Sequence, residues 1–223
     1  MAIKPILFNT EMVRAILDGR KTCTRRVIEL PENMDGVPVG KSGDSSNPLG
    51  FMYPGGIKRP PYQPGDILYV RETWCALPVN EAGHMRGHSI YYYRADGDLR
   101  PEGWRGKWRP SIHMPKEAAR IWLKVTDVRV ERLQEIDEDG VWDEGFKFKP
   151  PCLTRVSADG HTCDLDGPCM SSIKYCDMTI GELFRRELWN STIKKSDLNR
   201  YGWDANPWVW VIEFERCEKP EEI

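Results

Sequence analysis

Two long stretches of this chain show neither the period of a helix nor that of a strand. Residues 31–66 hold seven prolines and seven glycines in 36 positions, and residues 146–177 are polar and hold four cysteines. Loops of this length inside a compact domain are uncommon unless they are insertions or lids. A chain of 223 residues suits one domain with insertions, or two small domains. We expect a single domain over residues 1–223, with a Pro/Gly-rich and a Cys-rich loop insertion.

The remaining segments do carry a period. Residues 6–18 contain a predicted helix, because apolar side chains recur at i, i+1, i+4 and i+5 from Met12. Thr10 is a candidate N-cap, and Gly19 tolerates the left-handed conformation that ends a helix. Further short helices are predicted at residues 136–145 and 179–189, and strands at 67–74, 89–94, 121–132 and 208–215.

The order of these segments predicts the fold class. No alternation of strand, helix and strand is visible, so a doubly wound parallel sheet is not expected. Several strands joined by loops, with a few short helices, are typical of an α+β protein built on a small mixed β-barrel. The sequence contains no internal repeat.

The composition excludes several classes of protein. No stretch approaches the ~18 apolar residues of a membrane-spanning helix, and the N-terminus lacks the apolar core of a signal peptide. A net charge of −2 argues against a globally basic nucleic-acid binder, so any such site must be local. Phosphate-binding loop, zinc-protease and nucleophile-elbow motifs are absent. We expect a cytoplasmic protein without membrane contact.

A basic cluster directly follows the first predicted helix. Four of the seven residues in 20–26 are basic, and Lys21 stands three positions before Thr24. Threonine is a weak nucleophile that needs an adjacent base. Neighbouring guanidinium groups would lower the pKa of Lys21 and favour its neutral, basic form. On spacing alone, a salt bridge is the commoner use of such residues.

This cluster and several later segments resemble the ASCH domain family, a branch of the PUA-like barrels. The likeness is to the larger phage and prophage versions of the domain, covers about two thirds of the chain and leaves out both insertions. The resemblance implies a PUA-like barrel flanked by short helices, in the host cytoplasm if the chain is phage-encoded. The segments that carry it are residues 19–26, 64–74, 108–115, 121–132 and 203–210.

The resemblance also implies an activity. Some small bacterial ASCH proteins are amidohydrolases that remove acetyl from N4-acetylcytidine, and they are similar to this chain at the Lys-x-x-Thr motif and at a strand glutamate. Carried over, Thr24 is the nucleophile and Lys21 the base, while Glu72 orients Lys21 or protonates the leaving amine. No cofactor is implied for catalysis. We therefore expect a hydrolase acting on a modified nucleoside or base.

Other functions stay open. PUA-like barrels commonly bind RNA or modified bases, and a ribonuclease activity has been attributed to an ASCH protein. The chain is then a non-catalytic RNA- or DNA-binding module in which Arg20, Lys21, Arg25 and Arg26 clamp phosphates. A phage assembly protein with a vestigial pocket is a further alternative.

More candidate ligand-binding residues lie near the strand glutamate. Arg71 is a candidate phosphate ligand, with pairing to an acid as the competing interpretation. Trp74, Trp108 and His113 are candidate walls of a nucleobase pocket, and Ser111 is a candidate for bonding a base edge. For the tryptophans the alternative is core packing, and for His113 a structural hydrogen bond.

The Cys-rich insertion predicts a metal site. Its polar residues offer little apolar surface, so it needs another source of stability. The spacing differs from the Cys-x-x-Cys pairs of zinc ribbons. We expect one structural zinc, with His161 as reserve ligand, and free thiols or a disulfide as alternatives. The four expected ligands are Cys152, Cys163, Cys169 and Cys176.

Overall fold

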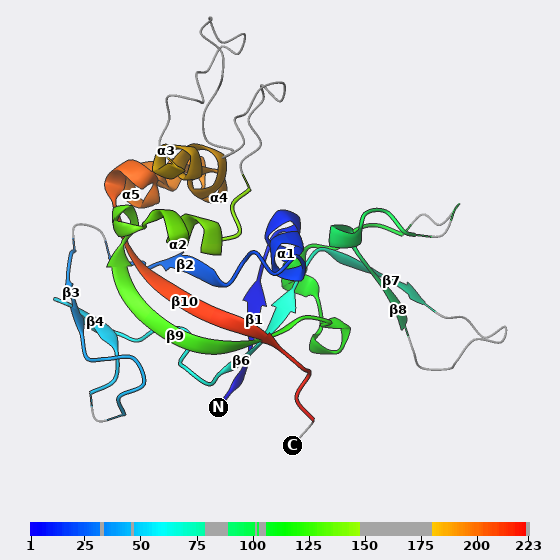
Figure 1. Ribbon diagram of the computed structural model, residues 1–223, viewed down its shortest axis with the longest axis horizontal. Helices are drawn as coiled ribbons and strands as arrows, with labels where there is room; N and C mark the ends of the chain where they lie inside the picture. Colours follow the sequence, from blue (N-terminus) through cyan, green and yellow to red (C-terminus); the bar gives the residue numbers. More distant parts are fainter. Residues whose placement is uncertain are drawn as a thin grey trace, which may run out of the picture.

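A curved five-stranded sheet forms the centre of the protein (Figure 1). The computed structural model describes residues 1–31, 34–45, 47–78, 89–100, 102, 106–147 and 180–221. β1 runs parallel to β6, and the other neighbours are antiparallel. The strand order is β1 (Ile3–Leu7), β6 (Ile67–Arg71), β9 (Trp122–Arg132), β10 (Trp208–Cys217) and β2 (Cys23–Val27). The protein is therefore α+β, as the sequence predicted.

The alternation of β10 divides the apolar residues between two cores, because successive side chains of a strand point to opposite faces. Trp210, Ile212 and Phe214 belong to the larger core, which includes residues of β1, β6 and α1. Val209 and Val211 belong to a second core, with residues of the C-terminal helices. We call the first face the inner face of the sheet and the second the outer face.

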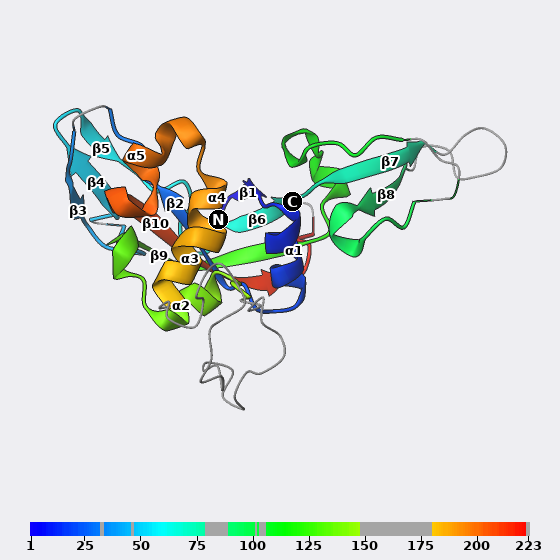
Figure 2. The same cartoon turned by 90° about the horizontal axis from the view of Figure 1, so that it is seen from above.

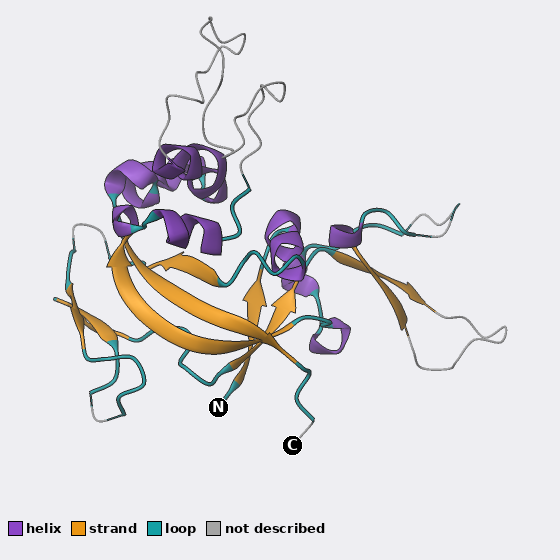
Figure 3. Ribbon diagram, viewed as in Figure 1, coloured by secondary structure: helices purple, strands orange, loops and turns teal. Residues whose placement is uncertain are grey.

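Helix α1 (Thr10–Leu17) follows β1 and lies at the ends of β1 and β6 (Figure 3). Gly19 has a φ of +75°, as expected for the residue that ends a helix. The expected N-cap, Thr10, is wrong. Asn9 caps the helix, because its side chain accepts a 2.9 Å hydrogen bond from the Met12 N–H and Thr10 is already the first helical residue.

The helices that follow β9 in the chain gather over the outer face (Figure 2). The predicted helix at 179–189 is α3 (Ile180–Phe184) continued by a π-helical turn, Arg185–Trp189. The remaining α-helices are α2 (Glu138–Asp143), α4 (Asn190–Thr192) and α5 (Leu198–Tyr201). Single 3₁₀ turns are η1 (Arg94–Asp96), η2 (Ser111–His113), η3 (Lys116–Ala118), η4 (Leu133–Glu135), η7 (Lys195–Asp197) and η8 (Trp203–Ala205).

Two small sheets accompany the large one. The expectation that residues 31–66 lack strands is wrong, because β3 (Val37–Val39), β4 (Gly50–Tyr53) and β5 (Gly56–Lys58) form an antiparallel sheet there. Strands of three or four residues are too short to show a period. The predicted strand 67–74 is broken after β6, and Trp74 begins β7 (Trp74–Pro78), which pairs with β8 (Ser89–Tyr93). This hairpin projects from the body (Figure 2).

The edges of the large sheet approach each other without a ladder. Among the described residues no backbone pairing joins β1 to β2, so the sheet is not closed by hydrogen bonds. Its curvature nevertheless brings the two edges within reach of a side chain. Arg26 Nη2 donates a 2.8 Å hydrogen bond to the Leu7 carbonyl. None of the described helices has the length and apolar character that crossing a membrane requires.

Candidate functional site

The parallel strands β1 and β6 end side by side, and the residues after them turn toward the inner face. Leu7 is the register partner of Arg71, and the Phe8 N–H donates a 3.2 Å hydrogen bond to the Arg71 carbonyl. Ile6 and Val70 both lie in the inner core, so Phe8 and Glu72 continue the same alternation. Phe8 is 2% exposed and Glu72 only 1%. A carboxyl group is thus buried beside an aromatic ring at this end of the core.

The start of β2 reaches Phe8 from the other edge of the sheet. Lys21 Nζ lies 5.5 Å from the centroid of the Phe8 ring. Thr24 is paired with Ile212, and residues opposite each other in a ladder share a face, so Thr24 is on the inner face as well. Lys21 is 3% exposed and Thr24 is 2% exposed. Lys21 and Thr24 therefore lie at the same end of the inner core as Glu72, and we call these three with Phe8 the Phe8 group.

A carboxylate that the sequence did not reveal holds Lys21. Lys21 Nζ donates to Glu144 Oε2 at 2.6 Å and to the Glu144 carbonyl at 3.0 Å. Glu144 Oε1 accepts from the Arg25 N–H at 2.6 Å and lies 3.5 Å from Arg25 Nη1. The expectation that Glu72 orients Lys21 is therefore corrected. The ion-pair partner of Lys21 is Glu144, the residue that follows α2.

Glu72 has a different partner, Arg120, which the sequence analysis also missed. Arg120 Nε and Nη2 bond the two carboxylate oxygens of Glu72 at 2.9 and 3.1 Å. Arg120 also bonds Asp96 at 2.7 and 3.0 Å and lies 3.9 Å from the centroid of the Tyr93 ring. Burial raises the pKa of Glu72, and the Arg120 contacts only partly oppose this. Glu72 thus favours its protonated form more than an exposed glutamate does.

The other basic residues of segment 20–26 are engaged within the protein. Arg20 pairs with Asp18 at 2.9 Å and lies partly exposed. The Arg25 side chain is 2% exposed and pairs with Glu131 at 3.4 Å. The basic side chains of residues 20–26 are bonded to carboxylate and carbonyl oxygens of the protein. The segment therefore does not present a row of unpaired cations. An arrangement as an exposed phosphate clamp draws little support from this geometry.

The predicted aromatic wall is built from the β7–β8 hairpin and the segment paired with it. Trp74 is 4% exposed and packs with Met114 and Ala118, as the packing interpretation requires. Arg94 and Arg100 lie 5.4 and 4.7 Å from the centroid of the Trp108 ring. The buried indole nitrogens of both tryptophans have no hydrogen-bond partner among the described residues.

The remaining predicted ligands are not drawn into the Phe8 group. Arg71 Nε donates to the Met114 carbonyl at 2.7 Å, which fixes it to the segment before η3. Ser111 and His113 form η2, where Ser111 is half-buried and His113 is exposed. Among the described residues the His113 ring makes no hydrogen bond, so the structural hydrogen bond expected for it remains a prediction.

The predicted zinc ligands lie outside the described residues, as does His161. Within the described residues, no group of three or more His, Cys, Asp or Glu side chains is placed to hold a metal. The cysteines described there are Cys23, Cys75 and Cys217, all free thiols. Burial raises the pKa of Cys23 to about 12, so this thiol beside the Phe8 group is not a ready nucleophile.

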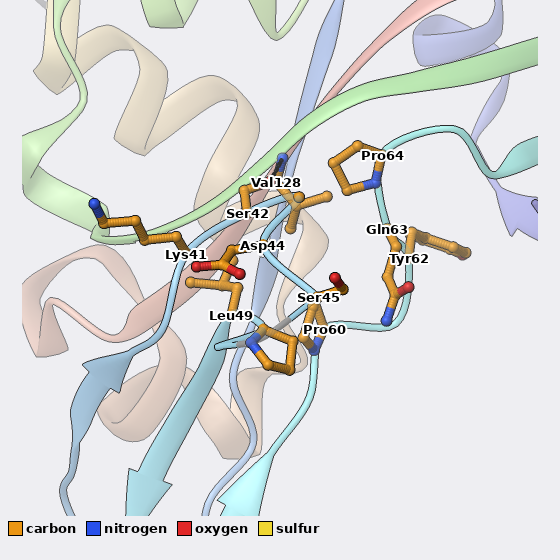
Figure 4. A pocket seen from close by; sticks show the side chains of 12 residues that line it. Lys41, Ser42, Asp44, Ser45, Leu49, Pro60, Tyr62, Gln63, Pro64 and Val128 are labelled. Carbon is orange, nitrogen blue, oxygen red and sulfur yellow. Dashed lines mark hydrogen bonds between the residues drawn. The ribbon is translucent and has the colours of Figure 1, made fainter.

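A cavity of about 190 Å³ lies away from the predicted site residues (Figure 4). Lys41, Ser42 and Asp44 line one side of it, and Tyr62 lines the other. Ser42 Oγ accepts a 3.2 Å hydrogen bond from the Val128 N–H, which fastens the loop before β4 to β9. None of the residues predicted to bind substrate lines this cavity.

Comparison with known proteins found no matching family model, no matching curated protein and no matching solved structure. The interpretation of the Phe8 group therefore rests on its own geometry and on the sequence motifs.

Proposed function

We propose that this protein is a hydrolase that cleaves the amide bond of an N4-acylated cytidine-like nucleoside or base. The observation that supports the proposal is the burial of Lys21, Thr24 and Glu72, which are all 3% exposed or less. Burying ionisable groups is costly, and such groups with perturbed surroundings cluster at functional sites. An ASCH-type, PUA-like barrel is the matching fold, in which the Arg26–Leu7 contact helps to bring the sheet edges together.

The first chemical step needs a neutral Lys21. The Lys21–Glu144 pair has zero net charge in two forms: an ammonium group with a carboxylate, and an amine with a carboxylic acid. Moving one proton across their 2.6 Å contact therefore creates the amine without changing the charge of the site. The amine then takes the proton of the Thr24 hydroxyl while Oγ bonds to the carbonyl carbon of the substrate.

The second step releases the amine. Glu72, whose pKa burial raises, donates a proton to the leaving nitrogen as the C–N bond breaks, which leaves an acyl ester on Thr24. Water then attacks the ester and gives one proton to Thr24 Oγ as the C–O bond breaks, which restores the threonine hydroxyl and frees the carboxylic acid. The proton that the Lys21–Glu144 pair gained from Thr24 returns through solvent to Glu72, so the site regains its starting protonation. The sum is amide plus water giving amine plus carboxylic acid.

The direct test is release of cytidine from N4-acetylcytidine by the purified protein, followed by chromatography. Thr24→Ala should lower the rate by about 10²-fold or more, because it removes the nucleophile. Thr22→Ala is the matched control, since the exposed Thr22 hydroxyl donates to Asp143 at 2.9 Å outside the Phe8 group. Unchanged turnover by Thr24→Ala would overturn the nucleophile, and no release from any N4-acylcytidine by the wild-type protein would overturn the reaction.

A non-catalytic RNA- or DNA-binding module is the competing function. It needs accessible cations, but the Lys21 and Arg25 side chains are 0% and 2% exposed. Labelled RNA titrated at several salt concentrations separates the two. A module that uses phosphate contacts loses roughly 0.7–0.9 log units of affinity per contact for each decade of salt. Salt-independent or absent RNA binding favours the hydrolase.

A further inference from the structure

A second cavity, of about 230 Å³, lies at the opposite end of β2 and β10 from the Phe8 group. Its walls combine two aromatic rings, Trp208 and Tyr201, with two guanidinium groups, Arg132 and Arg200. Paired rings and guanidinium groups suit a flat ligand that carries negative charge. None of these four residues belongs to the hydrolase mechanism.

Arg132 is held in place and its charge is balanced. Its guanidinium group stacks 4.2 Å from the centroid of the Trp208 ring and donates to Asp35 Oδ2 at 3.1 Å. Asp35 Oδ1 accepts from Trp208 Nε1 at 3.0 Å. Arg132 Nη1 also donates a 3.1 Å hydrogen bond to the carbonyl of Asn206, a residue whose φ of +44° is left-handed. Asp35 and Arg132 thus form a fixed, neutral pair on one wall.

Arg200 is not balanced in this way. It is half-buried, donates to the Leu30 carbonyl and lies 5.0 Å from the centroid of the Tyr201 ring. Among the described residues, no carboxylate oxygen lies within the 4.0 Å of an ion pair with its guanidinium group. Since Arg132 and Asp35 cancel, the described lining residues keep one positive charge. The planar fork of an arginine pairs well with a carboxylate, so an anionic ligand suits this wall.

The rest of the lining is apolar and limits the ligand. Leu30, Pro31 and Pro207 contribute carbon surface to the lining. A volume of about 230 Å³ is below the ~300–1,000 Å³ of sites for drug-sized molecules, so the ligand is close to the size of a single ring. We propose that this cavity binds a small aromatic carboxylate, whose carboxylate pairs with Arg200 and whose ring packs beside Trp208 and Tyr201.

Titration calorimetry with sodium benzoate tests the site, together with the NMR signal of the Trp208 indole N–H. We expect saturable binding in the millimolar range or tighter and a shift of that signal. Arg200→Met keeps the apolar stem and removes the charge, and it should weaken benzoate binding at least about 10-fold. Lys195→Met is the matched control, because it removes an exposed cation from the neighbouring turn η7 and should leave binding unchanged.

Three outcomes would overturn the proposal. They are the absence of saturable benzoate binding at millimolar concentrations, equal benzoate affinity in Arg200→Met and wild type, and inorganic phosphate binding as tightly as benzoate. The last would mean that charge alone is recognised and the ring is not. If Arg200→Met does not fold, Arg200→Lys keeps the charge without the planar fork, and weaker benzoate binding by that variant supports the same pairing. The deacylation assay is independent of every result here.

Discussion

Lys21 Nζ lies 2.6 Å from Glu144 Oε2, although the two residues are 123 positions apart in the chain. Both side chains are withdrawn from solvent, at 0% and 5% exposure. The contact joins the start of β2 to the residue after α2, so it connects the inner core with the helices of the outer face. It also fixes the position of the proposed base.

Replacing Glu144 with Gln should destabilise the protein strongly. The substitution leaves the Lys21 ammonium buried without its counterion, and breaking a buried pair from one side costs about 3–5 kcal/mol. Urea unfolding followed by circular dichroism gives the free energy of unfolding. Glu138→Gln removes an exposed carboxylate from the first turn of α2 and is the matched control.

The double variant Lys21→Met with Glu144→Gln separates charge from packing. Removing both charges abolishes the uncompensated ammonium, so the double variant should recover part of the stability lost in Glu144→Gln. A double variant no more stable than Glu144→Gln would show that the lost charge is not the cause. Cytidine release should be abolished in the double variant, because the proposed base is gone.

Gly145 holds the chain close to Lys21, and Gly145→Ala should be more damaging than an ordinary glycine substitution. An added Cβ would lie 2.6 Å from the Ala15 Cβ and 2.8 Å from the Lys21 Cβ. The clash should cost about 1–3 kcal/mol beyond the backbone strain. Gly19→Ala is the control, since Gly19 has nearly the same φ, +75° against +77°, and nothing within 4 Å of the new Cβ. Equal unfolding free energies for the two variants would contradict the prediction.

The sequence predicted those parts of the fold that repeat over many residues. The strand at 121–132 alternates along its length, and β9 matches it to within one residue. The strands of the 31–66 insertion were missed, because three or four residues carry no period. One contact that holds these strands is made by Phe51, which is fully buried. The centroid of its ring lies 5.4 Å from that of Trp208, a residue far along the chain.

The site was predicted less completely, for a physical reason. The resemblance indicated Lys21, Thr24 and Glu72, and all three are buried in the structure. It did not indicate their partners, Glu144 and Arg120. An ion pair between residues far apart in the chain depends on the topology of the fold, and it produces no recognisable spacing in the sequence. The one available signal was general: a carboxylate on a buried strand needs a cation close by.

The Cys-rich insertion should contain one zinc ion per chain. The prediction rests on the sequence, because a polar segment of this kind has little apolar surface to offset the entropy of ordering and a structural zinc supplies ~10–16 kcal/mol in small peptide sites. Elemental analysis of the purified protein measures the metal. Cys163→Ser and Cys169→Ser should each lower the zinc content, whereas Cys217→Ser, a free thiol in β10, should not. Zinc near zero with four titratable thiols in the insertion would refute the site.

The raised pKa of Glu72 predicts how stability and activity depend on pH. An ordinary glutamate loses its proton near pH 4.5, and burial moves the folded-state pKa of Glu72 above this value. Between these two pKa values the folded state binds more protons than the unfolded state, so stability falls as pH rises through the window. Glu72→Gln lacks this proton, so its unfolding free energy should not show this decline, whereas the exposed variant Glu218→Gln should follow the wild type. Urea unfolding at several pH values above 4.5 measures the difference, and parallel curves for wild type and Glu72→Gln would contradict this prediction.

If Glu72 is the acid of the hydrolase, kcat/KM should fall as pH rises through the same folded-state pKa, because only the protonated carboxyl can protonate the leaving amine.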